Sequence, residues 1–142
     1  MRPSPALALP VLAAALLLAT ACGNDCGPAE RCAYPGLLLA VHAPSGAALP
    51  DATVSQNGVA LSTDLTPIFC PDNKCTHAVT PAVSGRLTVS RPNYQDAFVD
   101  YVRRDDMCGR MIRQAVDVGM VETTLSQSPE VSAPQILGTT CN

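Results

Sequence analysis

The sequence predicts an all-β fold, a small antiparallel β-sandwich stapled by disulfides, in residues 36–125. Three observations favour this fold class. Short apolar or alternating runs recur about every ten residues with turn residues between them, which is typical of a sandwich. No segment has the spacing of an amphipathic helix. Seven cysteines stand among 142 residues, a density that suits a small exported domain held by disulfides.

The first expected strands lie at the start of this domain. Residues 36–43, GLLLAVHA, form an apolar run that is long enough for a strand and too short for a typical helix. Residues 53–62 predict a hairpin, because Asn57-Gly58 favours a type I′ turn in which both central residues have positive φ. Residues 64–84 contain three prolines and are expected to be irregular.

Two further strands are expected in the middle of the chain. Residues 85–90, GRLTVS, alternate so that Leu87 and Val89 lie on one face. Residues 97–104, AFVDYVRR, are rich in side chains that favour strands. These segments therefore predict a second pair of neighbouring strands.

The last part of the chain predicts the closing strands. DDMCG at residues 105–109 predicts a turn, and residues 113–118 and 121–125 are expected to be strands. Residues 126–142 show no periodicity and are expected to form a C-terminal extension that Cys141 ties to the domain.

Two stretches of this domain, GLLLAVHAPSGAALPDATVS at residues 36–55 and GRLTVSRPNYQDAFVDYV at residues 85–102, resemble the carboxypeptidase regulatory-like domain, a transthyretin-like or Ig-like β-sandwich. The resemblance extends over residues 36–125. Asn93 stands where this family usually has Gly, and Asn tolerates a left-handed turn position better than most residues. The resemblance implies an accessory folding and interaction module, without carboxypeptidase activity.

Residues 1–21 predict a secretory signal peptide that precedes the domain. Arg2 and the amino terminus supply positive charge, residues 6–21 are mostly apolar, and residues 19–21, Ala-Thr-Ala, are small enough for a cleavage site. The apolar run is short for a membrane span, which needs about 17–25 apolar residues.

The stretch from Leu18 to Cys22, LATAC, resembles the lipobox of bacterial lipoproteins, although Ala19 stands where Leu is usual. The resemblance implies cleavage before Cys22 and a diacylglyceryl group on that residue, with acyl chains such as palmitate that anchor the protein to a membrane. Gly23, rather than Asp, implies the outer membrane of a two-membrane envelope. An ordinary signal peptidase accepts the same bond, so an unlipidated Cys22 is the alternative.

The odd number of cysteines also bears on Cys22. If Cys22 carries lipid, six cysteines remain, which is enough for three disulfides. Cys70 and Cys75 flank PDNK, which is typical of a turn, and Cys26 and Cys32 flank GPAER. Other disulfide connectivities stay open. Residues 22–35 are expected to be a tether between lipid and domain. The expected pairs are Cys70–Cys75, Cys26–Cys32 and Cys108–Cys141.

Composition excludes some classes of partner. Removal of residues 1–21 takes one of nine basic side chains, Arg2, and leaves eight against twelve acidic ones. This balance disfavours a nucleic-acid partner, which needs a basic stripe. Trp is absent and there are only two Phe and three Tyr, so aromatic platforms for sugars or bases are scarce. We expect no nucleic acid and no cofactor.

Two histidines are the candidates for chemistry. His42 follows Val41 in an apolar run and is expected on the outer face of its strand. His77, together with Cys70, Cys75 and Cys108, is an alternative zinc-binding set. The spacing Cys-x4-Cys-x-His lacks the usual closely paired ligands, and an exported protein favours disulfides. We therefore expect no metal.

Paired charges and catalytic motifs offer little more. Asp105-Asp106 is expected to be solvated in a turn, and Arg103-Arg104 at the end of a strand. No spacing marks a nucleophile with its base. We predict no catalytic residues and no enzymatic activity.

Three functions remain in competition. The predicted one is a lipid-anchored, non-enzymatic envelope module that binds an unknown envelope protein or polysaccharide, or that helps to build a surface structure. The second is a small-ligand or carbohydrate-binding module, which an exposed cluster of Tyr94, Phe98 and Tyr101 would support. The third is an enzyme, which would need His42 or His77 beside an acid.

Overall fold

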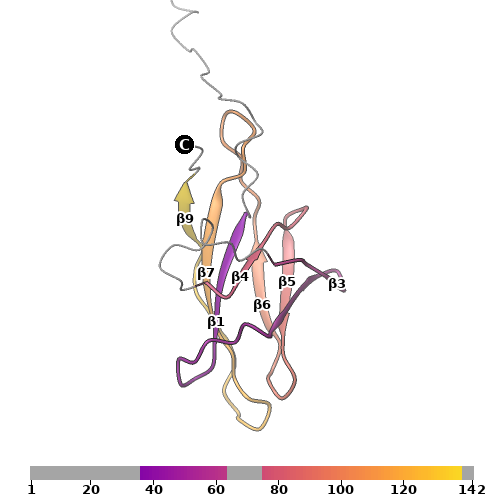
Figure 1. The fold of residues 1–142 in the computed structure, drawn as a ribbon, viewed down its shortest axis with the longest axis vertical. Coiled ribbons are helices and arrows are strands. Elements are labelled where there is room, and N and C mark those ends of the chain that lie inside the picture. Colours follow the sequence, from indigo (N-terminus) through magenta and orange to yellow (C-terminus); the bar gives the residue numbers. More distant parts are fainter. Residues whose placement is uncertain (1–35, 64–74, 139–142) are drawn as a thin grey trace, which may run out of the picture.

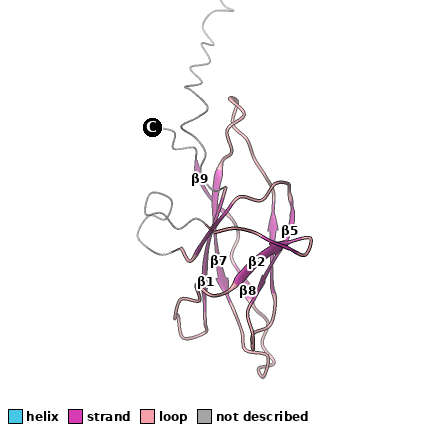
Figure 2. Ribbon diagram, turned by 45° about the vertical axis from the view of Figure 1, so that its right-hand side comes forward, coloured by secondary structure: helices cyan, strands magenta, loops and turns pink. Residues whose placement is uncertain are grey.

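The computed structural model describes residues 36–63 and 75–138, and the regular elements in these ranges are strands. Figure 2 shows them joined by loops, without a helix in the described part of the chain. No helix within these ranges is therefore long and apolar enough to cross a membrane. The strands are β1 (Leu37–His42), β2 (Thr53–Gln56), β3 (Val59–Ala60), β4 (His77–Val79), β5 (Gly85–Ser90), β6 (Ala97–Tyr101), β7 (Arg113–Gly119), β8 (Glu130–Val131) and β9 (Gln135–Gly138).

The strands form two sheets, which Figure 1 shows as two layers. Sheet A has the order β4-β1-β7-β8, and β9 pairs with another part of β7. Sheet B has the order β3-β2-β5-β6. The predicted all-β class and the sandwich-like arrangement are confirmed.

Both sheets contribute alternate residues to one apolar core. In β1 and β5 every second side chain is fully buried, including Leu39, Val41, Leu87 and Val89. This alternation is the physical basis of the sandwich, since successive side chains of a strand point to opposite faces. The prediction that Leu87 and Val89 share a buried face is confirmed. The core residues from the two sheets are Leu37, Leu39, Val41, Val79, Val116 and Val118 from sheet A, and Val54, Leu87, Val89, Ala97, Val99 and Tyr101 from sheet B.

One pairing departs from the predicted antiparallel arrangement. β1 and β7 run parallel, with Leu37 opposite Gln114 and His42 opposite Gly119. The cause is the connection that precedes β7. β6 ends at the edge of the molecule where β1 begins, and the chain turns through residues 102–112 before β7 returns alongside β1. All other strand pairs in the described ranges are antiparallel.

The turn chemistry expected from Asn and Gly is confirmed. Asn57 and Gly58 have φ of 51° and 78°, the sign that a type I′ hairpin requires, and they join β2 to β3. Asn93 has φ of 69°, in agreement with its expected left-handed conformation. These positions favour Asn and Gly because other side chains are strained there.

The structure also corrects several expected boundaries. β4 lies inside the segment expected to be irregular; its three residues are all buried, so they show no alternation. β6 ends at Tyr101, three residues before the expected end. β8 and β9 lie in the segment expected to lack strands and pair with β7.

Residues 121–125 are not a strand, which contradicts the prediction. The side-chain amide of Gln95 donates hydrogen bonds to the carbonyl oxygens of Glu122, Leu125 and Gln127 at 3.4, 2.9 and 2.8 Å. The backbone therefore wraps around one distant side chain, although its residues favour strands.

Candidate functional site

His42 lies at the end of β1 and faces Asp117 of β7 on the outer face of sheet A. Its Nε2 atom is 2.9 Å from Oδ2 of Asp117. The two strands place them together because Ala40 is the parallel partner of Asp117 and His42 that of Gly119. A Cβ atom on Gly119 would lie 3.4 Å from Cε1 of His42, an ordinary van der Waals distance, so the ring packs directly against this position. The outward position expected for His42 is confirmed.

The hydrogen bonds of His42 favour its charged form. Nδ1 is 3.1 Å from the carbonyl oxygen of Ala43, and Nε2 faces the Asp117 carboxylate. Both partners are acceptors, so only an imidazolium satisfies both. The hydrogen bond that His42 donates to Asp117 is the largest cause that raises the pKa of His42 above 6.5, followed by the hydrogen bond to the Ala43 carbonyl. In this arrangement neither ring nitrogen is left to accept a proton from a substrate.

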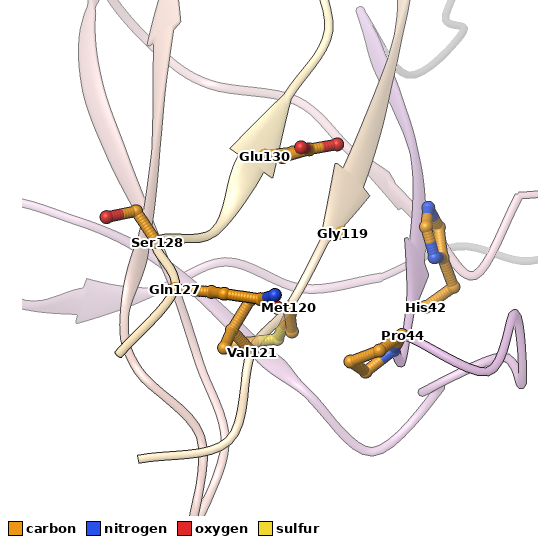
Figure 3. A pocket seen from close by; sticks show the side chains of 8 residues that line it. All are labelled: His42, Pro44, Gly119, Met120, Val121, Gln127, Ser128 and Glu130. Atoms are coloured by element: carbon orange, nitrogen blue, oxygen red, sulfur yellow. The ribbon is translucent and has the colours of Figure 1, made fainter. Parts of the chain in front are cut away.

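A surface hollow of about 480 Å³ adjoins His42 at the ends of β1 and β7. The buried side chains of Met120 and Val121 form part of its apolar lining, together with Pro44. In Figure 3, Glu130 extends from β8 toward the side of the hollow where His42 stands, whereas Ser128 points away. All eight lining residues are His42, Pro44, Gly119, Met120, Val121, Gln127, Ser128 and Glu130.

This geometry lacks the arrangement of a hydrolytic triad. A triad histidine uses one nitrogen toward an orienting acid and the other toward the nucleophile. Here Nε2 of His42 faces the acid and Nδ1 faces a backbone carbonyl. Ser128, the hydroxyl residue of the hollow, lies on the opposite side from His42 in Figure 3. The hollow is therefore a polar-rimmed, apolar-floored surface with a structural ion pair at one edge.

His77 is buried in β4 and links the two sheets. Only 3% of its surface is exposed. Its Nε2 is 2.6 Å from the carbonyl oxygen of Ala52, and its Nδ1 is 2.7 Å from Oγ1 of Thr76. Burial is the largest cause that lowers the pKa of His77 below 6.5, so the neutral ring donates through Nε2 and accepts at Nδ1. Both nitrogens are thereby occupied.

The proposed zinc set with His77 gains no support from this arrangement. Within residues 36–63 and 75–138, no three His, Cys, Asp or Glu side chains lie close enough to hold a metal ion. Cys75 and Cys108 are both disulfide-bonded, and a sulfur in a disulfide is not a thiolate ligand. Cys70 lies outside the described residues.

The remaining cysteine predictions are not tested. Each expected pair includes at least one residue outside the described ranges, so the pairings stay predictions. Cys22, the expected lipid site, also lies outside them. The residues concerned are Cys22, Cys26, Cys32, Cys70 and Cys141.

The three aromatic residues proposed as a binding cluster are separated. Tyr101 is 2% exposed in the core, whereas Phe98 is 51% exposed on the opposite face of β6. Phe98 stacks with Arg86 at 5.5 Å and Tyr94 with Arg91 at 4.9 Å, measured from the guanidinium carbon to the ring centre. The exposed aromatic cluster that would have supported a ligand-binding module is therefore not formed.

The acidic turn is more ordered than expected. Asp105 pairs with Arg103 at 3.2 Å and stays near the surface. Asp106 was expected to be solvated, but its carboxylate accepts hydrogen bonds from the backbone N–H groups of Cys108 and Arg110 at 2.8 and 2.9 Å. It also pairs with Nε of Arg110 at 2.7 Å. Asp106 therefore holds the turn together.

Sequence reasoning missed Asp117 and the residues of the hollow. Asp117 is the only acid in RQAVDV. The alternation of this strand could have predicted that its side chain points outward. Its partner lies 75 residues earlier, and only the pairing of β1 with β7 brings the two together. A scan of protein-family models and searches of curated proteins and of solved structures found no match to this chain.

Proposed function

We propose that this protein is a cell-envelope lipoprotein whose β-sandwich is a non-enzymatic binding or structural module. The anchor is lipid on Cys22, which becomes the first residue when the signal peptide at residues 1–21 is removed. The tether at residues 22–35 joins this anchor to the domain. The proposed location is the outer membrane, and the partner is an envelope protein or polysaccharide. LATAC, the odd cysteine count and Gly23 support these proposals.

One observation carries the binding role, namely the position of the hollow. The described chain begins at Gly36, next to the first residue of β1, and the hollow lies where β1 ends. Six residues of strand span about 20 Å at about 3.3 Å per residue. An anchor on the side of Gly36 therefore leaves the hollow at the far end of the sandwich, where an envelope partner has access to it.

The engaged state of the two histidines supports the absence of catalysis. Both ring nitrogens of His42 face hydrogen-bond acceptors. His77 is buried, and both of its ring nitrogens are hydrogen-bonded. Neither offers a base to a substrate in the hollow. Glu130 and Gln127 at the rim instead supply hydrogen-bonding groups around an apolar floor, which suits recognition.

The family and the disulfides are part of the same proposal. The carboxypeptidase regulatory-like assignment rests on the resemblance of residues 36–55 and 85–102 to that family. The bonded state of Cys75 and Cys108 supports an oxidised domain. The proposed pairs are Cys70–Cys75, Cys26–Cys32 and Cys108–Cys141.

The small-ligand alternative keeps one supporting observation. The hollow has a volume of about 480 Å³, within the range of about 300–1,000 Å³ for ligand pockets. The separation of Phe98 from Tyr101 removes the platform that a carbohydrate site would use. Native mass spectrometry of protein purified from the envelope would show a bound small molecule as added mass.

The test combines mass, fractionation and site-directed cross-linking in the native cell. Intact mass of the mature protein should exceed the polypeptide mass from Cys22 by a multi-chain lipid. A photo-cross-linking residue in place of Gln127, which lines the hollow, should trap an envelope component. The same residue in place of Phe98, exposed on the other sheet, is the matched control. Equal cross-linking at both sites, or none at Gln127, would contradict the binding role of the hollow.

A further inference from the structure

The connection between β6 and β7 forms a hairpin, residues 102–112, that extends past the ends of both sheets (Figure 1). Asp105 pairs with Met111 as an isolated bridge, and the N–H of Ile112 donates to the carbonyl oxygen of Arg104 at 2.8 Å. Met107 lies near the tip and is 89% exposed. A large apolar side chain is thus presented to the surroundings at one end of the molecule.

Hydrogen bonds order the backbone at the tip of the hairpin and thereby hold the Met107 side chain outward. The N–H of Asp106 donates to the carbonyl oxygen of Arg110 at 2.8 Å, and the N–H of Gly109 to that of Asp106 at 3.0 Å. The Asp106 carboxylate accepts two further hydrogen bonds, from the backbone N–H groups of Cys108 and Arg110. An ordered loop loses little conformational freedom when its exposed side chain meets a partner.

The hairpin lies at the end of the sandwich where the described chain begins. The N–H of Gln114 donates to the carbonyl oxygen of Gly36 at 3.0 Å. A Cβ atom on Gly36 would collide with Sδ of Met111, so the chain enters the domain directly against the base of the hairpin.

The length of the segment before Gly36 limits the distance between this end and the lipid. Cys22 is separated from Gly36 by the tether at residues 22–35. Fourteen residues reach at most about 50 Å even when fully extended. The hairpin is therefore within reach of the surface that holds the lipid, whereas the loops at the other end of β1 are a strand length farther away.

The charges around the tip fit an anionic surface. Arg103 is paired with Asp105 and Arg110 with Asp106. Arg104 is exposed and has no ion pair within the described ranges. With three arginines and two aspartates, the hairpin therefore carries one net positive charge, and Arg104, unpaired in the described part of the chain, lies opposite Ile112.

We propose that the hairpin of residues 102–112 is a membrane-contacting element, with Met107 inserted among the lipid headgroups and Arg104 bound to anionic phospholipid. The proposal rests on the proposed lipid anchor at Cys22. It orients the domain, because contact at Met107 directs the hollow beside His42 away from the bilayer.

The test uses the absence of tryptophan from the sequence. Lipidated Met107→Trp protein is reconstituted into vesicles of phosphatidylcholine and phosphatidylglycerol that carry a bromolipid quencher. Its fluorescence should shift to the blue and be quenched. Leu125→Trp is the matched control, since Leu125 is 43% exposed at the opposite end and should stay unquenched. Arg104→Gln in the Met107→Trp background should shift the contact equilibrium about fivefold toward the unbound state.

The outcomes separate the contact from the anchor. Intact mass reports lipid on each variant before reconstitution, and far-UV circular dichroism reports folding. Lipidated, folded Met107→Trp that is not quenched, or that is quenched no more than Leu125→Trp, overturns the contact and leaves the anchor standing. Protein without lipid overturns the anchor and the contact together. Slower hydrogen exchange of residues 106–110 in wild-type protein on these vesicles gives the same answer without a substitution.

Discussion

Replacement of His77 by Leu should destabilise the domain although the side-chain volume changes little. His77 is buried, its Nε2 donates to the carbonyl oxygen of Ala52, and its Nδ1 accepts from Thr76. Leucine supplies neither group. The hydroxyl of Thr76 keeps an acceptor, because the carbonyl oxygen of Leu39 is 3.2 Å away. The Ala52 carbonyl is the group that loses its side-chain donor.

The magnitude follows from that carbonyl. A buried polar group without a partner costs about 1–3 kcal/mol. We expect a loss of about 2 kcal/mol in the free energy of unfolding, which raises the unfolding constant about 30-fold. His42→Leu makes the same chemical change at the end of β1, on the outer face of sheet A, and breaks a partly exposed pair with Asp117, which is worth at most about 1 kcal/mol.

Urea denaturation followed by far-UV circular dichroism measures both variants. Similar stability of His77→Leu and His42→Leu would refute the assignment of His77 as a buried donor. The dependence on pH supplies a second check. Because the pKa of His77 is lowered below 6.5 by burial, its contribution is fully present above pH 6.5 and is lost as pH falls through the folded-state pKa. The difference between wild type and His77→Leu should shrink over that interval.

Four further predictions follow from individual residues. Val89→Asp puts an unpaired carboxylate into a fully buried core position at a cost of several kcal/mol, so no cooperative unfolding transition should remain. Asp117→Asn should return the pKa of His42 toward 6.5 in an NMR titration; the wild-type pair stabilises below pH 6.5, and this stabilisation is lost as pH rises through the raised pKa. The hydrogen bond from the backbone N–H of Arg110 is the largest cause that lowers the pKa of Asp106 below 3.8. The stability that the Asp106 carboxylate contributes is therefore present above pH 3.8 and is lost as pH falls through the lowered pKa. Hydrogen exchange of residues 106–110 should show this loss in wild type but not in Asp106→Asn. Thiol titration of denatured, unreduced protein should find no free thiol among the six cysteines after Cys22, and two or more would contradict three disulfides.

The parts of the fold that were predictable depend on local chemistry. β1 and β5 were found because alternation or a short apolar run marks a strand in a sandwich. The β2–β3 turn was found because Asn57 and Gly58 suit positive φ. In each case a few neighbouring residues determine the outcome, so no knowledge of distant partners was required.

The incorrect predictions concern segments whose structure depends on residues far away in the sequence. Residues 121–125 contain strand-favouring side chains, yet Gln95 binds three carbonyl oxygens around them and prevents a strand. β4 is only three residues long and is buried on all of them, so neither its length nor its periodicity marks it. His77 also looked like a potential metal ligand, and only its contacts with Ala52 and Thr76 show that it is structural.

The direction of β7 has the largest consequence for function. In the observed parallel register Asp117 lies one diagonal step from His42, and both strands end beside the hollow. An antiparallel pairing over the same residues would place His42 opposite Gln114 and leave the Asp117 carboxylate farther along the strand. The parallel register also brings the hairpin before β7 to the end where the chain enters β1. The two proposed contacts, with lipid at Met107 and with a partner at the hollow, therefore lie at opposite ends of one strand pair, and that separation allows an anchored domain to engage both at once.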